Sequence, residues 1–159
     1  MKIKYWVGCI CLLLSTTLTA QDRATLRQQQ FNVSPGSPAI KGYDPVAYFL
    51  KQQVVKGSKA FAWTEEGILY YFSSSQNRDI FKKNPGIYEP QYGGWCAYAM
   101  GESGEKVTID PETFKIVNGK LLLFYNRFFN NTLKSWNKNE QQLYKNAGAN
   151  WLKFFPQNQ

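Results

Sequence analysis

The chain has 159 residues and a formal net charge of +8, with 19 basic and 11 acidic side chains and no histidine. Without an imidazole, Ser-His-Asp and Cys-His catalysis are excluded, and so are histidine-ligated zinc, copper(II) and non-haem iron sites. The basic residues are spread along the chain, with no run longer than Lys82-Lys83 and no recognisable RNA-binding motif. This pattern predicts a solvated basic surface, suited to anionic components of the cell envelope, and no nucleic-acid partner.

The first twenty residues have the three-part layout of a secretory signal peptide. Lys2 and Lys4 precede an apolar run over residues 6–14, and a polar stretch of small residues ends at Ala20. The run is shorter than the roughly 20 apolar residues that span a bilayer. We therefore predict cleavage after Ala20 and a periplasmic or secreted location, with an uncleaved amphipathic anchor as the alternative. Cleavage lowers the net charge from +8 to +6 and leaves Cys96 as the single cysteine, so no intrachain disulfide can form.

Residues 21–38 are polar and end in Ser34-Pro35-Gly36-Ser37-Pro38, which is a linker composition. We predict a flexible N-terminal arm here, with one helical turn near Leu26 as an option, and an ordered domain from Ala39. Asp44-Pro45 has the pattern of an N-cap followed by a first helical position, so a short helix is expected over residues 46–50.

Two β-hairpins are predicted from residue type and turn chemistry. Residues 59–63 and 68–72 are rich in aromatic side chains and are separated by a turn that contains glycine. Residues 115–117 and 120–125 flank Asn118-Gly119, the dipeptide that best tolerates the positive φ angles of a type I′ turn. The second hairpin is the clearest local signal in the chain.

Helices are predicted over residues 76–83, after a run of serines, and at the C-terminus. Two apolar series with helical spacing indicate two C-terminal helices with a break near residues 137–139. The two series are Phe129, Leu133 and Trp136, and then Leu143, Ala147, Trp151 and Phe155. Together these elements predict one α+β domain over residues 39–155, with a tail at 156–159. In it, the two hairpins form a small antiparallel sheet packed by short helices and two C-terminal helices.

Several blocks of sequence resemble a known family. They are Ile40-Lys41-Gly42-Tyr43-Asp44-Pro45-Val46-Ala47-Tyr48-Phe49, Tyr70-Tyr71-Phe72-Ser73-Ser74 with Asp79-Ile80-Phe81, and Tyr88 followed by Pro90-Gln91-Tyr92-Gly93-Gly94-Trp95-Cys96-Ala97. In this order and spacing they resemble the YHS-domain proteins, in particular the small exported bacterial ones. The resemblance covers about residues 39–155.

The wider YHS family is thought to bind metal through cysteines, and this implied function does not carry over to the present chain. The positions that correspond to those cysteines are occupied by Ala47, Ser73 and Asn77. None of the three can supply a thiolate. The resemblance therefore implies a fold and leaves the activity open.

Cys96 and Met100 are the only two sulfur-bearing residues after residue 20, and they stand four positions apart. On a helix, both sulfur atoms would lie on one face, and thiolate with thioether is a ligand pair suited to copper(I). A reactive or redox thiol at Cys96 is a second hypothesis. Burial of both side chains in the core is the third, because free cysteine and methionine are common core residues.

The segment Gly93-Gly94 precedes Cys96 and can adopt positive φ angles with close approach of other backbone. It could begin a helix whose N-terminus favours a thiolate or holds an anion, or it could form a tight turn for packing. Aromatic residues with polar handles surround it in the sequence. The resulting candidate ligand site consists of Tyr43, Asp44, Tyr48, Tyr92, Gly93, Gly94, Trp95 and Cys96. We predict a non-catalytic binding or accessory module, with copper(I) handling and thiol redox chemistry as the alternatives.

Overall fold

The computed structural model describes the backbone of residues 12–155 and the side chains of residues 21–155. The first eleven residues of the predicted signal peptide and the predicted tail at 156–159 lie outside this range. The larger elements are the helices α1 (Leu12–Gln30), α2 (Ala47–Leu50), α3 (Ser75–Lys83), α4 (Pro85–Tyr88), α5 (Ala97–Glu102), α6 (Thr132–Trp136) and α7 (Glu140–Leu152), and the strands β1 (Ser58–Glu65), β2 (Ile68–Phe72), β3 (Asp110–Val117), β4 (Lys120–Phe124), β5 (Asn126–Arg127) and β6 (Asn130–Asn131). Two short 3-10 segments are η1 (Ala39–Gly42) and η2 (Gln91–Gly94).

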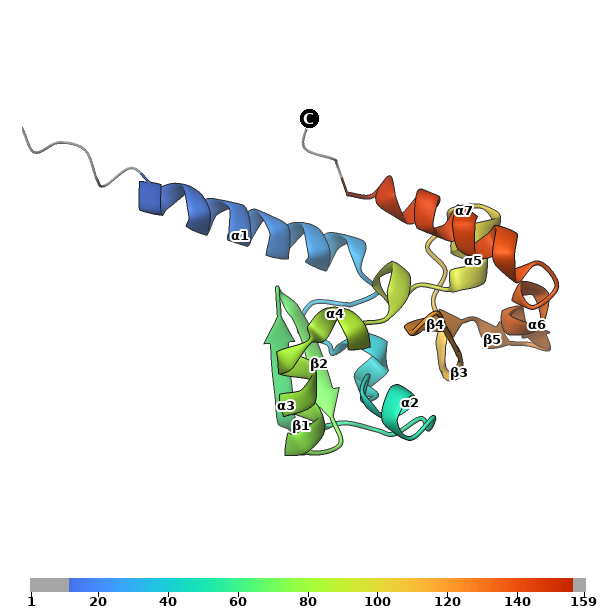
Figure 1. The fold of residues 1–159 in the computed structure, drawn as a ribbon, viewed down its shortest axis with the longest axis horizontal. Helices are drawn as coiled ribbons and strands as arrows, with labels where there is room; N and C mark the ends of the chain where they lie inside the picture. Colours follow the sequence, from blue (N-terminus) through green and yellow to red (C-terminus); the bar gives the residue numbers. More distant parts are fainter. Residues whose placement is uncertain (1–11, 156–159) are drawn as a thin grey trace, which may run out of the picture.

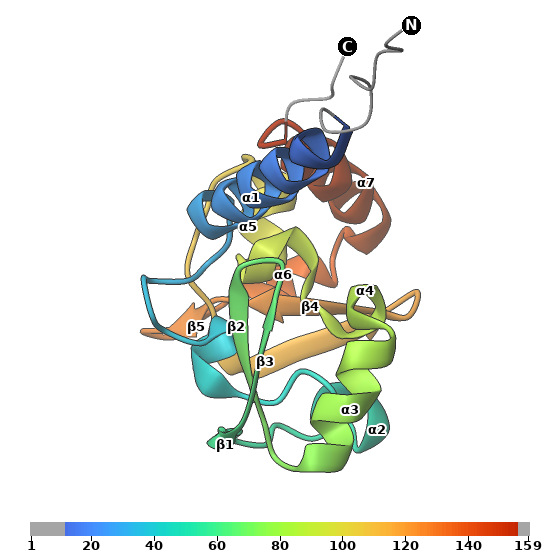
Figure 2. The same cartoon turned by 90° about the vertical axis from the view of Figure 1, so that its left-hand side faces the viewer.

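The fold is α+β, as predicted. Helices α1 and α7 both lie across the top of the molecule in Figure 1 and Figure 2, with the β1–β2 hairpin and α3 below α1. The side chains between these elements form two buried clusters. One contains Phe31, Val46, Tyr48, Ile68, Tyr70, Phe72, Phe81, Cys96, Leu121 and Leu123, and the other contains Tyr92, Ala97, Met100, Leu122, Phe124, Trp136, Leu143 and Ala147. Leu121 and Leu123 of β4 belong to the first cluster and Leu122 to the second, because successive side chains of a strand point to opposite faces. β4 therefore separates the two clusters.

Both predicted hairpins are present, but they do not form one sheet. β1 pairs with β2 and β3 pairs with β4, each as a separate antiparallel pair, and each register shifts at one point along the first strand. Isolated parallel bridges from Pro90 to Leu121 and from Cys96 to Leu123 join the segment after α4 to the edge of β4 that does not pair with β3. The loop that carries the candidate site is thus fixed to a strand of the second hairpin.

A third hairpin, β5–β6, replaces the expected start of the first C-terminal helix. Phe129 was predicted to lie on the apolar stripe of that helix, but it occupies the turn between the two short strands and is fully exposed, next to the 88% exposed Phe128. The helix α6 begins only at Thr132, after Asn131, whose side chain accepts a hydrogen bond from the amide of Leu133. The asparagine cap sets the helix start, so the four-residue spacing from Phe129 is not helical.

The turns of β3–β4 and β5–β6 have the same backbone geometry and very different residues. Asn118 and Gly119 have φ angles of 51° and 69°, and Phe128 and Phe129 have φ angles of 51° and 64°. Both pairs therefore have the two positive φ angles of a type I′ turn. A side chain in the left-handed region costs roughly 1–2 kcal/mol per residue, and bulky residues are rare there. The Phe128-Phe129 turn is strained where the Asn118-Gly119 turn is not.

Residues 21–38 are more ordered than predicted. Helix α1 continues to Gln30, and its last turn packs on the domain so that Arg27 and Phe31 are 8% and 7% exposed. Further along, the amide of Ser37 donates to the carbonyl of Ser34 and closes a turn. The prediction of a flexible arm was wrong for this segment. Its composition is mostly polar, but Arg27 and Phe31 are buried against residues far along the chain.

Asp44 joins three segments through a carboxylate that is completely buried. Its Oδ1 accepts hydrogen bonds from the amides of Val46 and Ala47, which explains the predicted cap before α2. Its Oδ2 accepts from the amide and the hydroxyl of Ser73, at 2.8 and 2.6 Å, and from the Asn77 amide group at 2.6 Å. The acid thereby holds α2 against the end of β2 and the start of α3.

We expect Asp44→Asn to lower the free energy of unfolding by about 2–3 kcal/mol, because an amide NH₂ group then faces donors that need an acceptor. Chemical denaturation of both proteins measures this difference. Asp79→Asn is the matched control, since the Asp79 side chain is 55% exposed and pairs only with its neighbour Arg78, and we expect a change below about 0.5 kcal/mol. Equal effects of the two substitutions would contradict the role given to Asp44.

Candidate functional site

The Gly93-Gly94 segment forms a tight turn with positive φ angles, one of the two predicted possibilities. In η2, Tyr92, Gly93 and Gly94 have φ angles of 55°, 60° and 81°. The chain then turns extended at Trp95 and Cys96 before α5 begins at Ala97. The amide of Cys96 donates to the carbonyl of Val107, so it is not a free donor for an anion. No helix begins at the two glycines, because α5 starts three residues after Gly94, at Ala97.

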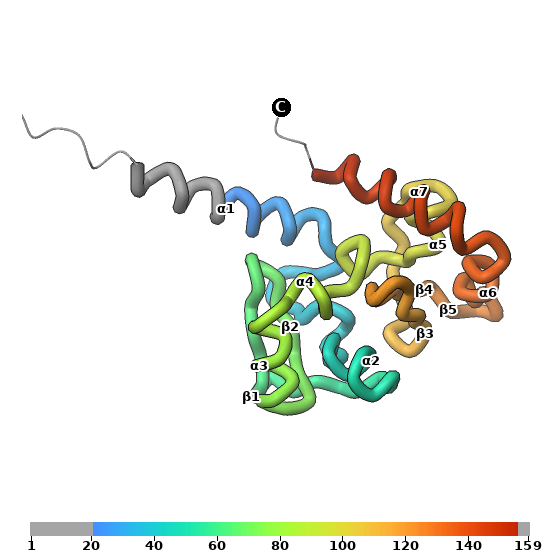
Figure 3. The backbone as a smooth tube through the Cα atoms, viewed as in Figure 1, coloured from blue at the N-terminus to red at the C-terminus, as the bar shows by residue number. Residues whose placement is uncertain are grey.

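Gly93 lies where the beginning and the end of the domain meet. A Cβ atom on Gly93 would lie 2.7 Å from the Trp151 ring of α7 and 3.1 Å from the Cα atom of Phe31. The rings of Phe31 and Trp151 also contact each other edge to face, with centroids 5.9 Å apart. In Figure 3 the end of α1 and its following residues meet the turn of residues 91–94 at this point. Glycine is required here for space as well as for its φ angle.

Hydrogen bonds fasten the arm to the same turn. The backbone amide of Asn32 donates to the carbonyl of Gly93, and its side-chain amide donates to the carbonyl of Gly94, both at 2.9 Å. The indole of Trp95 donates to the carbonyl of Gln30 at 2.7 Å. The polar groups of the predicted glycine site are therefore engaged by residues 30–32 of the same chain.

A pocket of about 270 Å³ opens beside this crossing. Tyr92 and Gly93 of the predicted site line it, together with residues from α1, from the segment after α4 and from the C-terminal end of the domain. Its other principal lining residues are Arg27, Phe31, Glu89, Pro90, Trp151 and Phe155. Four of the lining residues are aromatic, the charged groups come from Arg27 and Glu89, and Gly86 and Gln91 complete the lining. The pocket therefore combines aromatic rings with a polar lining, which is more polar than the usual small-molecule pocket.

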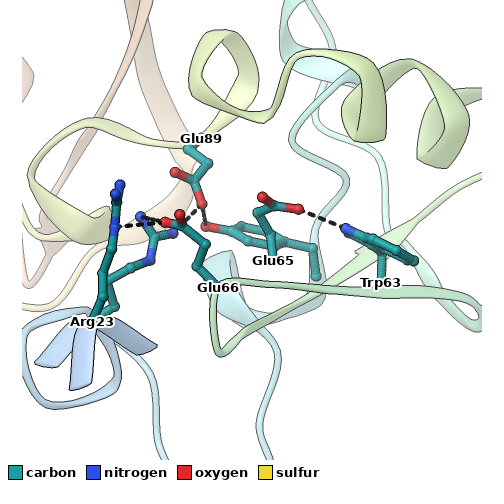
Figure 4. A network of polar contacts seen from close by, with 7 residues as sticks. Arg23, Trp63, Glu65, Glu66 and Glu89 are labelled. Atoms are coloured by element: carbon teal, nitrogen blue, oxygen red, sulfur yellow. Dashed lines mark hydrogen bonds and ion pairs between the residues drawn. The ribbon is translucent and has the colours of Figure 1, made fainter. Parts of the chain in front are cut away.

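Arg27 is the central polar residue of the pocket. Its Nη2 donates to Glu89 at 2.5 Å, its Nη1 pairs with Glu66 at 3.4 Å, and its guanidinium lies 4.5 Å from the ring centre of Phe31. Figure 4 shows Glu66 and Glu89 approaching this network from opposite sides, with Arg23 beside Glu66. Five N–H groups are available on a guanidinium, and these carboxylates leave some of them without acceptors.

The Nε atom of Arg27 has no hydrogen-bond partner, and it is the one buried side-chain nitrogen or oxygen of which this is true among the residues whose side chains the structure describes. A buried donor left unpaired costs about 1–3 kcal/mol. A ligand that brings an acceptor to this nitrogen would recover that free energy. The unpaired donor belongs to a residue that lines this pocket and does not line the other two hollows described in the structure.

The hydroxyl of Tyr70 donates a hydrogen bond to the Glu89 carboxylate at 2.9 Å. Burial, and then the charge of Glu89, raise the pKa of Tyr70 well above its ordinary value of 10. Burial also raises the pKa of Tyr92, with a smaller contribution from Tyr144. Both phenols stay protonated at neutral pH, so neither acts as a base there.

The structure does not bring the other predicted residues into this pocket. The hydroxyl of Tyr48 donates to the carbonyl of Pro111, and the hydroxyl of Tyr43 donates to Glu112. Asp44 is held in its own network, as described above. Trp95 lines a different hollow of about 510 Å³, together with Lys41. Of the eight predicted residues, Tyr92 and Gly93 belong to the pocket.

Cys96 and Met100 are both completely buried, and they belong to different core clusters. The Cys96 sulfur accepts from the amide of Tyr125 at 3.3 Å and lies 3.4 Å from the Thr132 hydroxyl. The copper(I) and thiol hypotheses both require an accessible Cys96, and packing in the core is the hypothesis that the structure matches.

The three positions implied by the family resemblance do converge in space, although none carries a thiol. The amide of Ala47, the hydroxyl of Ser73 and the side-chain amide of Asn77 all donate to Asp44, and Asn77 also contacts Ser73. The carboxylate of Asp44 takes up every one of these donors. In this chain the arrangement serves to hold α2, β2 and α3 together.

Arg27 and Glu89 are the two charged pocket residues that sequence reasoning missed. Arg27 lies in the stretch predicted to be flexible, and Glu89 lies in a connecting segment. A single arginine in a polar segment carries no periodic signal, because its burial depends on partners 62 residues away. The one available hint was Phe31, an aromatic residue in an otherwise polar arm.

Comparisons of this chain with family models, with curated proteins and with solved structures found no match. Among residues 12–155, none of the helices combines the length and the apolar character needed to cross a membrane. The resemblance to YHS-domain proteins remains a prediction from the sequence.

We expect Gly93→Ala to destabilise the protein by about 2–4 kcal/mol, because the new methyl group meets Trp151 and Phe31 in addition to the strain of a positive φ. Gly119→Ala isolates the backbone strain, since Gly119 has a φ of 69° and no atom within 4 Å of an added Cβ. Thermal or urea unfolding of both variants gives the difference, which should be at least about 1 kcal/mol. Equal destabilisation would mean that the crossing tolerates a side chain.

We also expect the Cys96 thiol to resist alkylation in the folded protein, because its exposure is 0% and its sulfur is hydrogen-bonded. Labelling located by peptide mass spectrometry distinguishes Cys96 from Cys9 and Cys11. Modification of Cys96 should appear only when denaturant unfolds the chain. Rapid labelling under native conditions would restore the thiol hypotheses.

Proposed function

We propose that this protein is an exported, non-catalytic binding module of YHS type, and that its ligand occupies the pocket lined by Arg27, Phe31, Glu89, Tyr92, Gly93 and Trp151. The ligand is a small neutral molecule with an aromatic or apolar body and one hydrogen-bond acceptor. Export and family membership rest on the sequence. The choice of pocket and of ligand class rests on the contacts of Arg27.

The unpartnered Nε of Arg27 is the observation that carries the proposal. The guanidinium is held in place by Glu89, Glu66 and the ring of Phe31, so the unpaired N–H group belongs to a rigid side chain. Little side-chain entropy of Arg27 would therefore be lost when a ligand acceptor binds. The four aromatic residues of the lining, Phe31, Tyr92, Trp151 and Phe155, would supply apolar contact to the ligand.

The charge balance around the pocket favours a neutral ligand over an anion. Arg23 and Arg27 contribute two positive charges, and Glu66 and Glu89 contribute two negative ones in direct contact with them. An added carboxylate beside Glu89 would meet a like charge. An amide or ketone oxygen accepts the same hydrogen bond without that repulsion.

The polar groups of the pocket support binding rather than turnover. An arginine stays charged at every relevant pH, and the raised pKa values of Tyr70 and Tyr92 keep both phenols neutral. General acid–base catalysis needs a group that exchanges a proton near neutral pH, and the sequence has no histidine for that role. The predicted cleavage after Ala20 removes the first part of α1, residues 12–20, and leaves Arg27 and the rest of the helix in the mature chain.

Benzamide and toluene test the proposal as a matched pair of probes, because they share the aromatic ring and differ in the acceptor group. We expect benzamide to shift the Arg27 Nε–H and Trp151 indole N–H resonances in ¹H–¹⁵N spectra with saturation, and to bind at least about tenfold more tightly than toluene. Arg27→Lys should remove this preference. Arg23→Lys, at an exposed arginine of the same helix, should preserve it.

Two results would overturn the assignment. One is that benzamide leaves both resonances unmoved up to its solubility limit. The other is that Arg23→Lys and Arg27→Lys weaken benzamide binding equally, which would place the effect in the surface charge and not in the pocket. Thermal unfolding of each variant confirms that the comparison is made on folded protein.

A further inference from the structure

The tip of the β5–β6 hairpin carries two phenylalanine side chains in water. Phe128 is 88% exposed and Phe129 is fully exposed, and neither belongs to a core cluster. They are the two central residues of the turn, so both rings project from its end. Scattered single apolar residues are ordinary on a protein surface, but two adjacent rings at a protruding tip are not.

The fold does not require phenylalanine at either position. The same chain builds a turn with the same two positive φ angles from Asn118 and Gly119, which adopt them with little strain. Phe128 and Phe129 therefore add backbone strain and exposed apolar surface without any compensating contact in the described structure. Strained backbone residues that no local contact explains are candidates for a functional role.

The sequence around the tip is basic and free of acidic residues. From Leu121 to Asn139 the chain contains Arg127, Lys134 and Lys138 and no aspartate or glutamate. Arg127 directly precedes the two phenylalanines. Lys41 also lies on this side of the molecule, since its pKa is lowered by burial and then by the charge of Arg127.

Two carboxylates approach the base of the hairpin, and both are engaged within the protein. Asp110 accepts hydrogen bonds from the amide of Glu112 and from the hydroxyl of Thr113, and Glu112 accepts from the hydroxyl of Tyr43. Thr113 in turn accepts from the side-chain amide of Asn126 at the start of β5. The acidic groups thus sit at the root of the hairpin, while the tip has only Arg127 beside its rings.

We propose that the β5–β6 tip inserts Phe128 and Phe129 into the interface of a bilayer that contains anionic lipids, with Arg127 at the level of the headgroups. A convex tip with two rings offers far less than the roughly 800 Å² per partner of a standard protein interface. Two rings with flanking cations do match reversible association with a lipid surface. The area and the charge both favour a membrane over a protein partner.

The test compares the full chain with the variant Phe128→Asn/Phe129→Gly, which copies the unstrained turn of the second hairpin. We expect the full chain to co-sediment with phosphatidylglycerol vesicles and not with phosphatidylcholine vesicles, and the variant to partition at least about tenfold more weakly. The variant should unfold at an equal or higher temperature, because the turn strain is removed. A merely structural role for the two rings predicts the opposite shift.

Two controls locate the effect at the tip. Hydrogen exchange of peptides covering residues 125–131 should slow when phosphatidylglycerol vesicles are added, and this readout is independent of the apolar N-terminal run. Leu50→Asn replaces another exposed apolar residue, 56% exposed at the end of α2, and should leave binding unchanged. Equal binding of the full chain and the double variant, or unchanged exchange at the tip, would overturn the proposal. A failure of the full chain to bind either vesicle would also overturn it and leave a protein partner for the hairpin.

Discussion

The close approach of three segments at Gly93 is the contact on which the rest of the arrangement depends. The Phe31 backbone and the Trp151 ring lie so near Gly93 that no side chain fits between them. This crossing positions the last turn of α1, and with it Arg27, against the loop that carries Glu89 and Tyr92. The pocket is therefore a product of how the two ends of the domain pack on one turn.

Two buried charged groups show the difference between a structural and a functional polar residue in this protein. The carboxylate of Asp44 accepts five hydrogen bonds and has no need of a further partner. The guanidinium of Arg27 is bound by two carboxylates and still keeps a buried N–H without an acceptor. Judged by burial alone, both Asp44 and Arg27 would have been candidate functional residues. The completeness of their hydrogen bonding separates them.

Local chemistry in the sequence was enough to predict much of the fold. Asn118-Gly119 specified its turn, Asp44-Pro45 its cap, and Leu143 and Ala147 are buried on α7 as their spacing indicates. In each case the determining interactions lie within a few residues. A hairpin or a cap can be read from a sequence for that reason.

The failures came where distant partners or a local cap override a pattern. Phe129 continues a helical spacing, but the capping side chain of Asn131 starts the helix later and leaves Phe129 in a turn. The arm looked like a linker because its ordering depends on residues more than 60 positions away. The glycines were correctly expected to adopt positive φ, yet the pocket beside them depends on an arginine that no motif marks. Long-range packing has no local signature.

The edge-to-face contact between Phe31 and Trp151 joins residues about 120 positions apart in the chain. Bringing such distant rings together costs more chain entropy than forming any of the hairpins, which close within a few residues. During synthesis the contact is impossible until α7 has left the ribosome. The hollow beside Arg27 is accordingly a feature of the finished polypeptide, and a chain shortened before Trp151 would display its hairpins without it.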